Sequence, residues 1–255
     1  MKQISGILFC LLTVIVLGSC QKELSIQVNN PFTPALGNKV LTYSETDTVT
    51  GPGGPVIYSD SFRLTYDGND RLLSLTNVLS PGDNFIFAYG TGSYTMLLNV
   101  NNAPDVHEVF YLNSHPFVDS TFQYNSTNDS STEKYTYDAS WRLSSLKEYD
   151  YSAATGSVLS NQTNYTYDAN GNMLTETDIT TGEIYNYEYY SDLNTVFMGQ
   201  VYAPGNKNLV KKTIYTDGVD TVISSYTYTF DSLNRVTSER AVSDNGLISV
   251  KRYTY

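Results

Sequence analysis

The 255-residue sequence has little cysteine, histidine or basic charge, and each shortage narrows the classes of protein that fit it. With only 2 Cys, a disulfide-rich scaffold is excluded. The 2 His, His107 and His115, lie near Pro104 and Pro116, where a surface strand and loop explains them better than a metal or acid-base site. Acidic residues outnumber Lys and Arg by 26 to 15, which argues against nucleic acid and against an anionic membrane surface as partners. We expect no cofactor and no bound metal.

Catalytic motifs are also missing. The sequence has no Gly-x-Ser-x-Gly nucleophile motif and no recognisable set of Ser, His and an acid. An enzyme would have to use paired carboxylates, and no spacing selects a pair among Glu176, Asp178, Glu183 and Glu188. The run Asp168-x-Asn170-x-Asn172 is similar to the start of a calcium loop, but Ile179 stands where the bidentate Glu belongs. We therefore predict a protein without catalytic activity.

The one long hydrophobic run is at the N-terminus. Three residues, Met1 to Gln3, precede an apolar stretch from Ile4 to Val16 that is too short for a membrane-spanning helix and has the length of a signal peptide. The tetrad Leu17-Gly18-Ser19-Cys20 closes this stretch and resembles the bacterial lipobox. The resemblance implies that residues 1–19 are a lipoprotein signal peptide and that Cys20 is acylated, which would anchor the protein to a membrane.

The residues after Cys20 bear on the destination of the protein. Gln21 is not the Asp that commonly retains lipoproteins at the inner membrane. The resemblance therefore implies the outer membrane of a Gram-negative bacterium, on its periplasmic or cell-surface side. Residues 20–40 show no sustained period and are interpreted as the lipidated Cys and a flexible tether. Cleavage would also remove Cys10, so the domain at residues 41–255 must be stable without a disulfide.

Aromatic residues alternate with polar residues along much of the domain, as in β-strands with one buried face. The segments are Phe62/Leu64/Tyr66, Phe85/Phe87/Tyr89, Tyr135/Tyr137, Tyr149/Tyr151, Tyr185/Tyr187/Tyr189, Tyr226/Tyr228/Phe230 and Tyr253/Tyr255. Turn signals between them predict an all-β antiparallel meander of roughly 10–14 strands. A sheet of that size twists and curls, so we expect an open or closed barrel-like sheet.

One seven-residue phrase recurs at the predicted hairpin turns. Its copies begin Tyr66-Asp67, Tyr137-Asp138, Tyr167-Asp168 and Phe230-Asp231, and a degenerate copy spans residues 190–196. The fifth positions are Asp70, Trp141, Gly171 and Asn234. We expect a type I turn with a bulge, in which Gly171 takes the positive φ that the turn requires. Trp141 is the residue type least suited to that conformation.

The repeated phrase resembles the YD repeat of the RHS family, whose members form β-hairpin arrays that wrap into hollow shells around a cargo. That resemblance covers roughly residues 62–255, in a chain far shorter than those shells. In its size and in the spacing of its repeats, the chain is more similar to small lipoproteins in a family of unknown function. That family is described as having a porin-like fold. Both resemblances imply hairpin architecture, and neither implies a particular activity.

The functional hypothesis is based on tyrosines that share one face of a strand. Tyr185, Tyr187 and Tyr189 share a face, and so do Tyr226 and Tyr228. Such a face could bind a glycan or another envelope component, because Tyr combines a ring with a polar hydroxyl. The alternatives are a packed core, a structural scaffold of RHS-like type without a small ligand, and a transmembrane barrel. The last needs a continuous apolar outer band, which Thr, Asn and Glu faces do not supply.

Overall fold

The computed structural model describes residues 40–51, 54–69, 71–115, 117–125, 130–152, 155–194 and 206–255. Within these ranges no helix is long and apolar enough to cross a membrane. Sixteen strands follow one another: β1 Thr42–Gly51, β2 Gly54–Tyr66, β3 Leu72–Asn77, β4 Asn84–Tyr89, β5 Ser93–Val100, β6 Ala103–Leu112, β7 Val118–Asn125, β8 Ser130–Tyr137, β9 Leu143–Ser152, β10 Gly156–Tyr167, β11 Met173–Asp178, β12 Ile184–Asn194, β13 Asn208–Thr216, β14 Thr221–Phe230, β15 Val236–Ser243 and β16 Leu247–Thr254.

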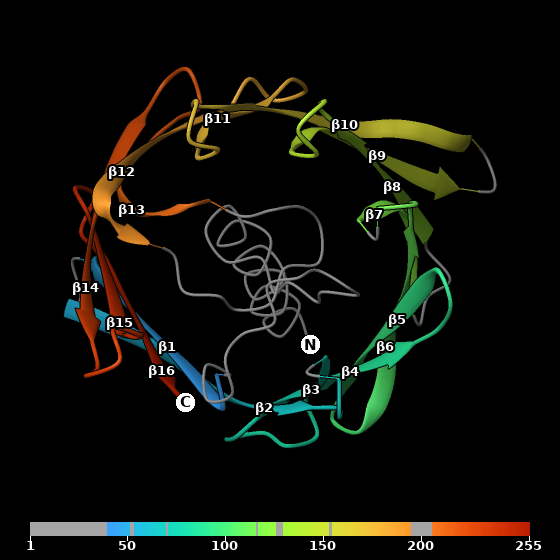
Figure 1. Ribbon diagram of the computed structural model, residues 1–255, viewed down its shortest axis with the longest axis horizontal. Coiled ribbons are helices and arrows are strands. Elements are labelled where there is room, and N and C mark those ends of the chain that lie inside the picture. Colours follow the sequence, from blue (N-terminus) through green and yellow to red (C-terminus); the bar gives the residue numbers. More distant parts are fainter. Residues whose placement is uncertain are drawn as a thin grey trace.

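The strands form one antiparallel meander that closes into a barrel (Figure 1). Each strand pairs with the strands before and after it in sequence, and β1 pairs with β16, with Thr42 opposite Thr254. Every strand therefore has a neighbour on both sides, although residues 54–60 of β2 extend beyond β3 and pair with β1 alone.

The predicted all-β meander is confirmed, but the predicted count of 10–14 strands was too low. Strands without alternating aromatic residues were missed, such as β13, whose sequence is NLVKKTIYT. In such a strand both neighbours supply the pairing, so the strand forms without an aromatic face of its own. The structure also decides between the open and the closed sheet, because β1 and β16 are in register over eight residue pairs.

Burial alternates along the strands and distinguishes the two faces of the wall. In β2, Phe62 and Leu64 are buried whereas Arg63 and Thr65 are exposed. Side chains crowd together on the concave side of a closed sheet, so the buried set faces the inside of the barrel. The core lines this inner face: Phe62, Leu64, Leu72, Leu75, Phe85, Phe87, Tyr94, Leu98, Val106, Phe110, Val118, Tyr135, Leu143, Val236 and Tyr253.

The outer face carries hydroxyl side chains that pair across strands, together with exposed apolar side chains such as Ile86 and Phe122. Exposed pairs join Thr42 to Thr254 at 2.6 Å, Thr65 to Ser74 at 2.7 Å, Thr166 to Thr175 at 2.6 Å and Thr229 to Thr237 at 2.9 Å between oxygen atoms. Cross-strand pairs of this kind contribute roughly 0.2–1 kcal/mol each. The outer wall is thus stabilised by contacts that are compatible with water.

One rim of the barrel carries the turns with the repeated phrase. In the β2–β3 turn, Asp67 Oδ1 accepts hydrogen bonds from the backbone N–H of Asn69 at 2.8 Å and of Arg71 at 2.9 Å, and Oδ2 accepts one from Arg71 Nε at 2.6 Å. Partial burial raises the pKa of the Asp67 carboxyl, but these hydrogen bonds lower the pKa more, so it lies below its usual value. The ionised Asp holds the turn closed.

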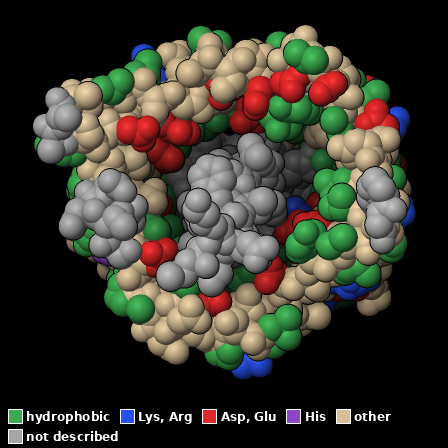
Figure 2. Space-filling model, turned by 180° about the vertical axis from the view of Figure 1, so that it is seen from behind, with side chains coloured by type: hydrophobic (Ala, Val, Ile, Leu, Met, Phe, Trp, Pro, Cys, Tyr) green, Lys and Arg blue, Asp and Glu red, His purple; other side chains and the backbone are tan. Residues whose placement is uncertain are grey.

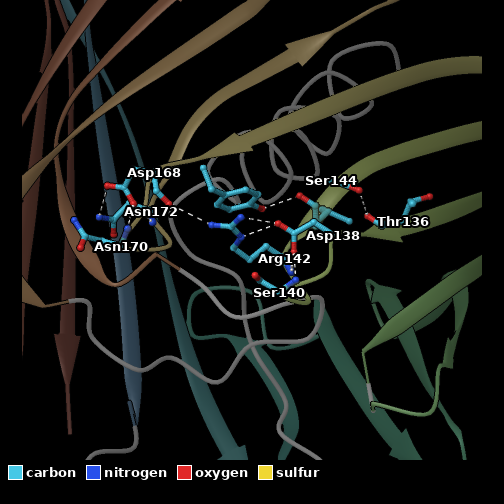
Figure 3. Close-up of polar contacts among 10 residues, drawn as sticks. Thr136, Asp138, Ser140, Arg142, Ser144, Asp168, Asn170 and Asn172 are labelled. Carbon is cyan, nitrogen blue, oxygen red and sulfur yellow. Dashed lines mark hydrogen bonds and ion pairs between the residues drawn. The ribbon is translucent and has the colours of Figure 1, made fainter.

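The same contacts recur in the other copies. Asp138 and Asp231 accept from Arg142 and Arg235 in the same way, and in the β10–β11 turn Asn172 takes the place of Arg (Figure 3). A register shift that marks a bulge accompanies each turn. Three fifth positions are in the left-handed region, with φ of 61° at Trp141, 91° at Gly171 and 59° at Asn234; the fourth, Asp70, lies outside the described residues. This conformation strains most residues other than Gly and Asn.

Replacing Gly171 with Val is expected to lower the free energy of unfolding by roughly 1–3 kcal/mol, because a β-branched residue is strained at positive φ. A Cβ built at Gly171 meets no atom within 4 Å, so the cost comes from the backbone alone. Gly171→Asn should cost much less, since Asn234 holds the same position in another turn. Thermal unfolding followed by circular dichroism measures both variants, and equal melting temperatures would contradict this account of the turn.

A further copy of the turn, at residues 112–118, was not recognised in the sequence. Asn113 Oδ1 accepts hydrogen bonds from the backbone N–H of His115 at 2.8 Å and of Phe117 at 3.2 Å, as Asp67 does in its own turn. Asn in place of Asp and Phe in place of Arg hid this copy. The expected copy at residues 190–196 does not form a turn where it is described, because Tyr190 to Asn194 belong to β12.

Candidate functional site

Most tyrosines near the turn rim have a structural role that the sequence did not reveal. At the end of an even-numbered strand, a Tyr hydroxyl donates a hydrogen bond to a backbone carbonyl near the start of the preceding strand; we call this contact a tyrosine clasp. The described residues contain seven clasps: Tyr66 to Val40, Tyr89 to Leu72, Tyr137 to Val118, Tyr167 to Leu143, Tyr189 to Met173, Tyr228 to Val210 and Tyr255 to Val236.

The Arg of each turn covers the ring of a clasp tyrosine. The Arg71 guanidinium lies 4.4 Å from the centroid of the Tyr89 ring, and Arg235 lies 4.3 Å from that of Tyr255. Arg142 lies 4.8 Å from the Tyr167 ring and also donates from Nη1 to the carbonyl of Asp168 (Figure 3). Each of these three turns is therefore tied to a following hairpin by a cation–π contact and by the clasp of the covered tyrosine.

The five tyrosines of the candidate ligand face all line the inner wall, and two of them are clasps. Tyr189 and Tyr228 donate to backbone carbonyls at 2.7 and 2.9 Å. Tyr187 is buried and donates to Glu176 at 3.1 Å. Tyr185 is half-buried, and its ring centroid lies 4.8 Å from that of Tyr215.

Tyr226, also half-buried, is 3.3 Å from the Thr213 hydroxyl, measured between oxygen atoms. The five tyrosines of the candidate face therefore do share one surface, on the inside of the barrel. All five tyrosines therefore contact other residues of the wall; Tyr187 is buried, and the other four are half-buried.

Three glutamates form a row on the inner face of β6, β8 and β9. Glu133 lies directly opposite Glu148 in the register and opposite Thr121 on its other side. The Thr121 hydroxyl donates to Glu133 Oε2 at 3.3 Å, and the Tyr135 hydroxyl donates to the same oxygen. Glu108, one strand further, is only 9% exposed. Figure 2 shows acidic side chains gathered around the opening of the barrel.

Burial and mutual repulsion shift the pKa values of these carboxyls upward. Burial raises the pKa of Glu108, and the neighbouring Glu133 raises it further. Burial likewise raises the pKa of Glu133, against the hydrogen bonds from its two hydroxyl partners. Burial, followed by the charges of Glu133, Asp150 and Asp178, raises the pKa of Glu148 to about 7. The row therefore holds protons at pH values where exposed glutamates are ionised.

A second charged group lies where the two ends of the sheet meet. Lys251 on β16 is directly opposite Glu45 on β1 and Glu239 on β15. Its Nζ is 3.2 Å from Glu45 Oε1, and Glu239 is 4% exposed. Tyr43 and Ser249 also donate hydrogen bonds to the Glu45 carboxylate. We call Glu45, Lys251 and Glu239 the closing cluster. Its ammonium compensates the charge of the carboxylates at the seam, where β1 meets β16.

An aromatic cluster lies at the turn rim between the β6–β7 and β8–β9 turns. The His115 and Trp141 ring centroids are 3.5 Å apart and their planes are inclined by 30°. Phe117 lies 6.2 Å from Trp141 and 5.6 Å from Tyr137 between centroids. Phe117 therefore covers a clasp tyrosine as Arg does in the other copies, and Trp141 extends this contact outward.

The carboxylates considered for an enzyme do not converge. Glu176 lies on the inner face, whereas Glu188 lies on the outer face and pairs with Lys212 at 3.1 Å. Asp178 and Glu183 belong to the β11–β12 turn, where the Asp178 N–H donates to the Glu183 carbonyl at 2.9 Å. The wall therefore separates Glu188 from Glu176.

The two histidines also lie apart. His107 is on the outer face of β6 against the ring of Tyr124, and His115 is in the β6–β7 turn. Among the residues that the structure describes, no group of three or more His, Cys, Asp or Glu side chains is arranged to hold a metal ion. The lipobox residue Cys20 and the signal peptide lie outside the described residues.

Comparison with known proteins gives the fold but no activity. No protein-family model matches the sequence, and no curated protein matches it. A porin-like protein from Bacteroides uniformis is similar in structure, with a TM-score of 0.63 at 13% identity over 86% of this chain and 98% of its own. One from Bacteroides vulgatus gives 0.57 at 12% identity over 85% and 98%. The chain therefore has a porin-like fold, a closed antiparallel barrel of 16 strands.

Proposed function

We propose that this protein is a lipid-anchored barrel of the Gram-negative outer membrane that does not span the membrane and binds a neutral polar envelope component, such as a glycan, on its tyrosine-lined inner wall. The lipobox tetrad ending at Cys20 supports the anchor. The tyrosines of the inner wall support the assignment of a neutral polar ligand. The observation that carries the proposal is the contrast between a hydroxyl-rich outer wall and an aromatic inner wall.

The outer wall supports a barrel surrounded by water. A barrel that crosses a membrane presents a continuous apolar band to lipid, and a charge at its midplane costs roughly 2–4 kcal/mol. Here Arg63, Arg240 and Arg252 are exposed among the hydroxyl pairs of the outer face. Exposed apolar side chains such as Tyr111 and Phe122 also lie on this wall, but a continuous apolar band would have to accommodate these three arginines.

The inner wall supports a neutral ligand better than a charged one. The net charge of −11 disfavours an anionic polymer, and the buried glutamates, whose pKa values are raised, add no cation that would attract one. Tyr185 and Tyr226 are half-buried on this wall, so part of each ring is accessible for stacking against a sugar.

A glycan array probed with the purified lipoprotein tests this proposal. Binding should weaken by about tenfold in Tyr185→Ala or Tyr226→Ala, which corresponds to ~1.4 kcal/mol of lost contact. Tyr124→Ala, an exposed tyrosine on the outer wall, is the matched control and should bind normally. Absence of binding to every glycan, or equal binding by all three variants, would refute the inner-wall assignment.

The anchor has its own test. Cys20→Ala should abolish incorporation of radiolabelled palmitate, because the acyl chains are attached through that Cys, and should release the protein from the membrane fraction. Equal labelling of the wild type and the variant would contradict the lipoprotein assignment. A Ser249→Ala variant, which changes only the folded domain, should be labelled normally and controls for expression.

A structural scaffold is the second candidate, and the tyrosine clasps favour it. Seven tyrosine hydroxyls are engaged by backbone carbonyls, so much of the tyrosine content is explained without a ligand. On this proposal the chain is an RHS-like assembly module whose repeated phrase exists to join hairpins. Normal envelope assembly in a deletion strain would count against it.

A further inference from the structure

Trp141 is the single Trp of the chain, and it occupies a backbone position that suits Gly or Asn. Its φ is 61°, in the left-handed region where a bulky residue is strained, while Gly171 and Asn234 fill the same position in two sister turns. Stability alone therefore does not favour Trp here. A residue that strains its own backbone in this way is expected to contribute something other than stability.

The Trp141 ring is held in place yet remains accessible. His115 lies against it with ring centroids 3.5 Å apart, and Phe117 and Tyr137 flank it at 6.2 and 6.4 Å. The residue is still 37% exposed. These contacts come from two turns that are separated in sequence, so the ring is fixed by tertiary packing rather than by its own loop. Because the indole is already fixed, little side-chain entropy is lost when a flat ligand binds to it.

Polar side chains lie beside the ring, and its charged neighbours in sequence are paired with each other. Ser114 and Ser140 are exposed beside it, and the Ser114 hydroxyl is 3.2 Å from His115 Nδ1. The nearest ions, Asp138 and Arg142, neutralise each other at 2.7 Å. An aromatic platform with neighbouring hydroxyls suits a neutral sugar ring, which offers C–H groups to the indole and hydroxyls to the serines.

We propose that the rim cluster of His115, Trp141, Ser114 and Ser140 is a binding site for a neutral saccharide, separate from the inner-wall tyrosines. The acidic net charge of −11 disfavours anionic polysaccharides at the same place. This inference extends the proposed function to a second set of residues. It stands or fails independently, because the rim cluster and Tyr185 lie on different elements.

Because the chain has one Trp, its fluorescence reports on the rim cluster alone. The test uses the full lipidated chain in a polyoxyethylene detergent, which avoids sugar-based detergents that could compete. The probes are dextran, a soluble β-glucan, a xylan and a proline-rich uncharged peptide. A neutral polysaccharide should shift the emission saturably and protect the indole from acrylamide quenching. Failure of all three polysaccharides, or a response to the peptide alone, would overturn the proposal.

Variants separate this site from the inner wall. Trp141→Gly, which removes the ring and relieves the backbone strain, should weaken polysaccharide retention in affinity electrophoresis by about tenfold. Trp141→Phe should keep part of the affinity, and Tyr111→Leu, an exposed tyrosine of the outer wall, should keep all of it. Unchanged retention by a folded Trp141→Gly variant would refute the rim site. Loss of binding in Tyr185→Ala without any change in Trp emission would place the ligand inside the barrel instead.

Discussion

Lys251→Met is expected to lower the free energy of unfolding by about 3–5 kcal/mol, because it leaves two buried carboxylates without their cation. Lys251 lies between Glu45 and Glu239 in the register, with side-chain exposures of only 14% for Lys251 and 13% for Glu45. Burial lowers the pKa of Lys251, but the two carboxylates raise it more, so the pKa lies above its usual value and the ammonium is retained. Urea unfolding at pH 7 measures the loss.

The chain provides a matched control on its outer wall. Lys212 and Glu188 are 3.1 Å apart, but their side chains are 30% and 53% exposed, and water screens the pair. Lys212→Met should therefore change the free energy of unfolding by less than about 1 kcal/mol. The triple variant Glu45→Gln, Glu239→Gln, Lys251→Met should recover much of the loss, since no charge is then left unpaired. Equal effects of Lys251→Met and Lys212→Met would show that the closing cluster does not stabilise the seam.

Glu108→Gln is expected to stabilise the barrel at pH 8 by roughly 2–4 kcal/mol, given that one pKa unit corresponds to ~1.4 kcal/mol. Burial and the charge of Glu133 raise the pKa of Glu108 in the folded state above that of the unfolded chain. The folded state therefore holds the proton more tightly, and stability falls as the pH rises from the unfolded pKa through the folded one. At pH 4 the carboxyl is protonated in both states, so the variant should there match the wild type.

Melting temperatures at pH 4 and pH 8 measure this difference. Glu148→Gln should act in the same direction with a smaller effect, because its pKa is raised to about 7 and the side chain is less buried. Glu188→Gln on the outer wall serves as the control and should change the melting temperature little at either pH. A Glu108→Gln variant that is destabilised at pH 8 would contradict the assignment of an upward shift.

Local patterns in the sequence were sufficient for the hairpins. The Asp of the repeated phrase can reach the backbone N–H groups two and four residues later, and these are neighbours in sequence. Gly171 was expected at positive φ for the same local reason. The copy at Asn113 was missed because Asn and Phe replace Asp and Arg, although the backbone contacts are the same. The pattern of residue types was lost while the geometry was kept.

The role of tyrosine could not be obtained in this way. The alternation along β12 and β14 predicted a shared face, and that face exists on the inner wall. The partner of each hydroxyl, however, is a carbonyl some 16 to 26 residues away, as in Tyr189 to Met173 and Tyr66 to Val40. Which hydroxyls donate to backbone carbonyls depends on the register between strands, so the clasp role of Tyr189 and Tyr228 becomes evident only in the structure.

The sequence by itself determined the all-β class, the turn chemistry and the polar outer surface, because each follows from contacts or alternation within a few residues. Only the tertiary structure decided the closure of the sheet, the row of Glu108, Glu133 and Glu148, and the position of His115 against Trp141. These depend on pairings between distant segments, such as Thr42 with Thr254. A strand pattern of period two specifies which side chains share a face, but it does not specify which strand lies beside it or whether the last strand meets the first.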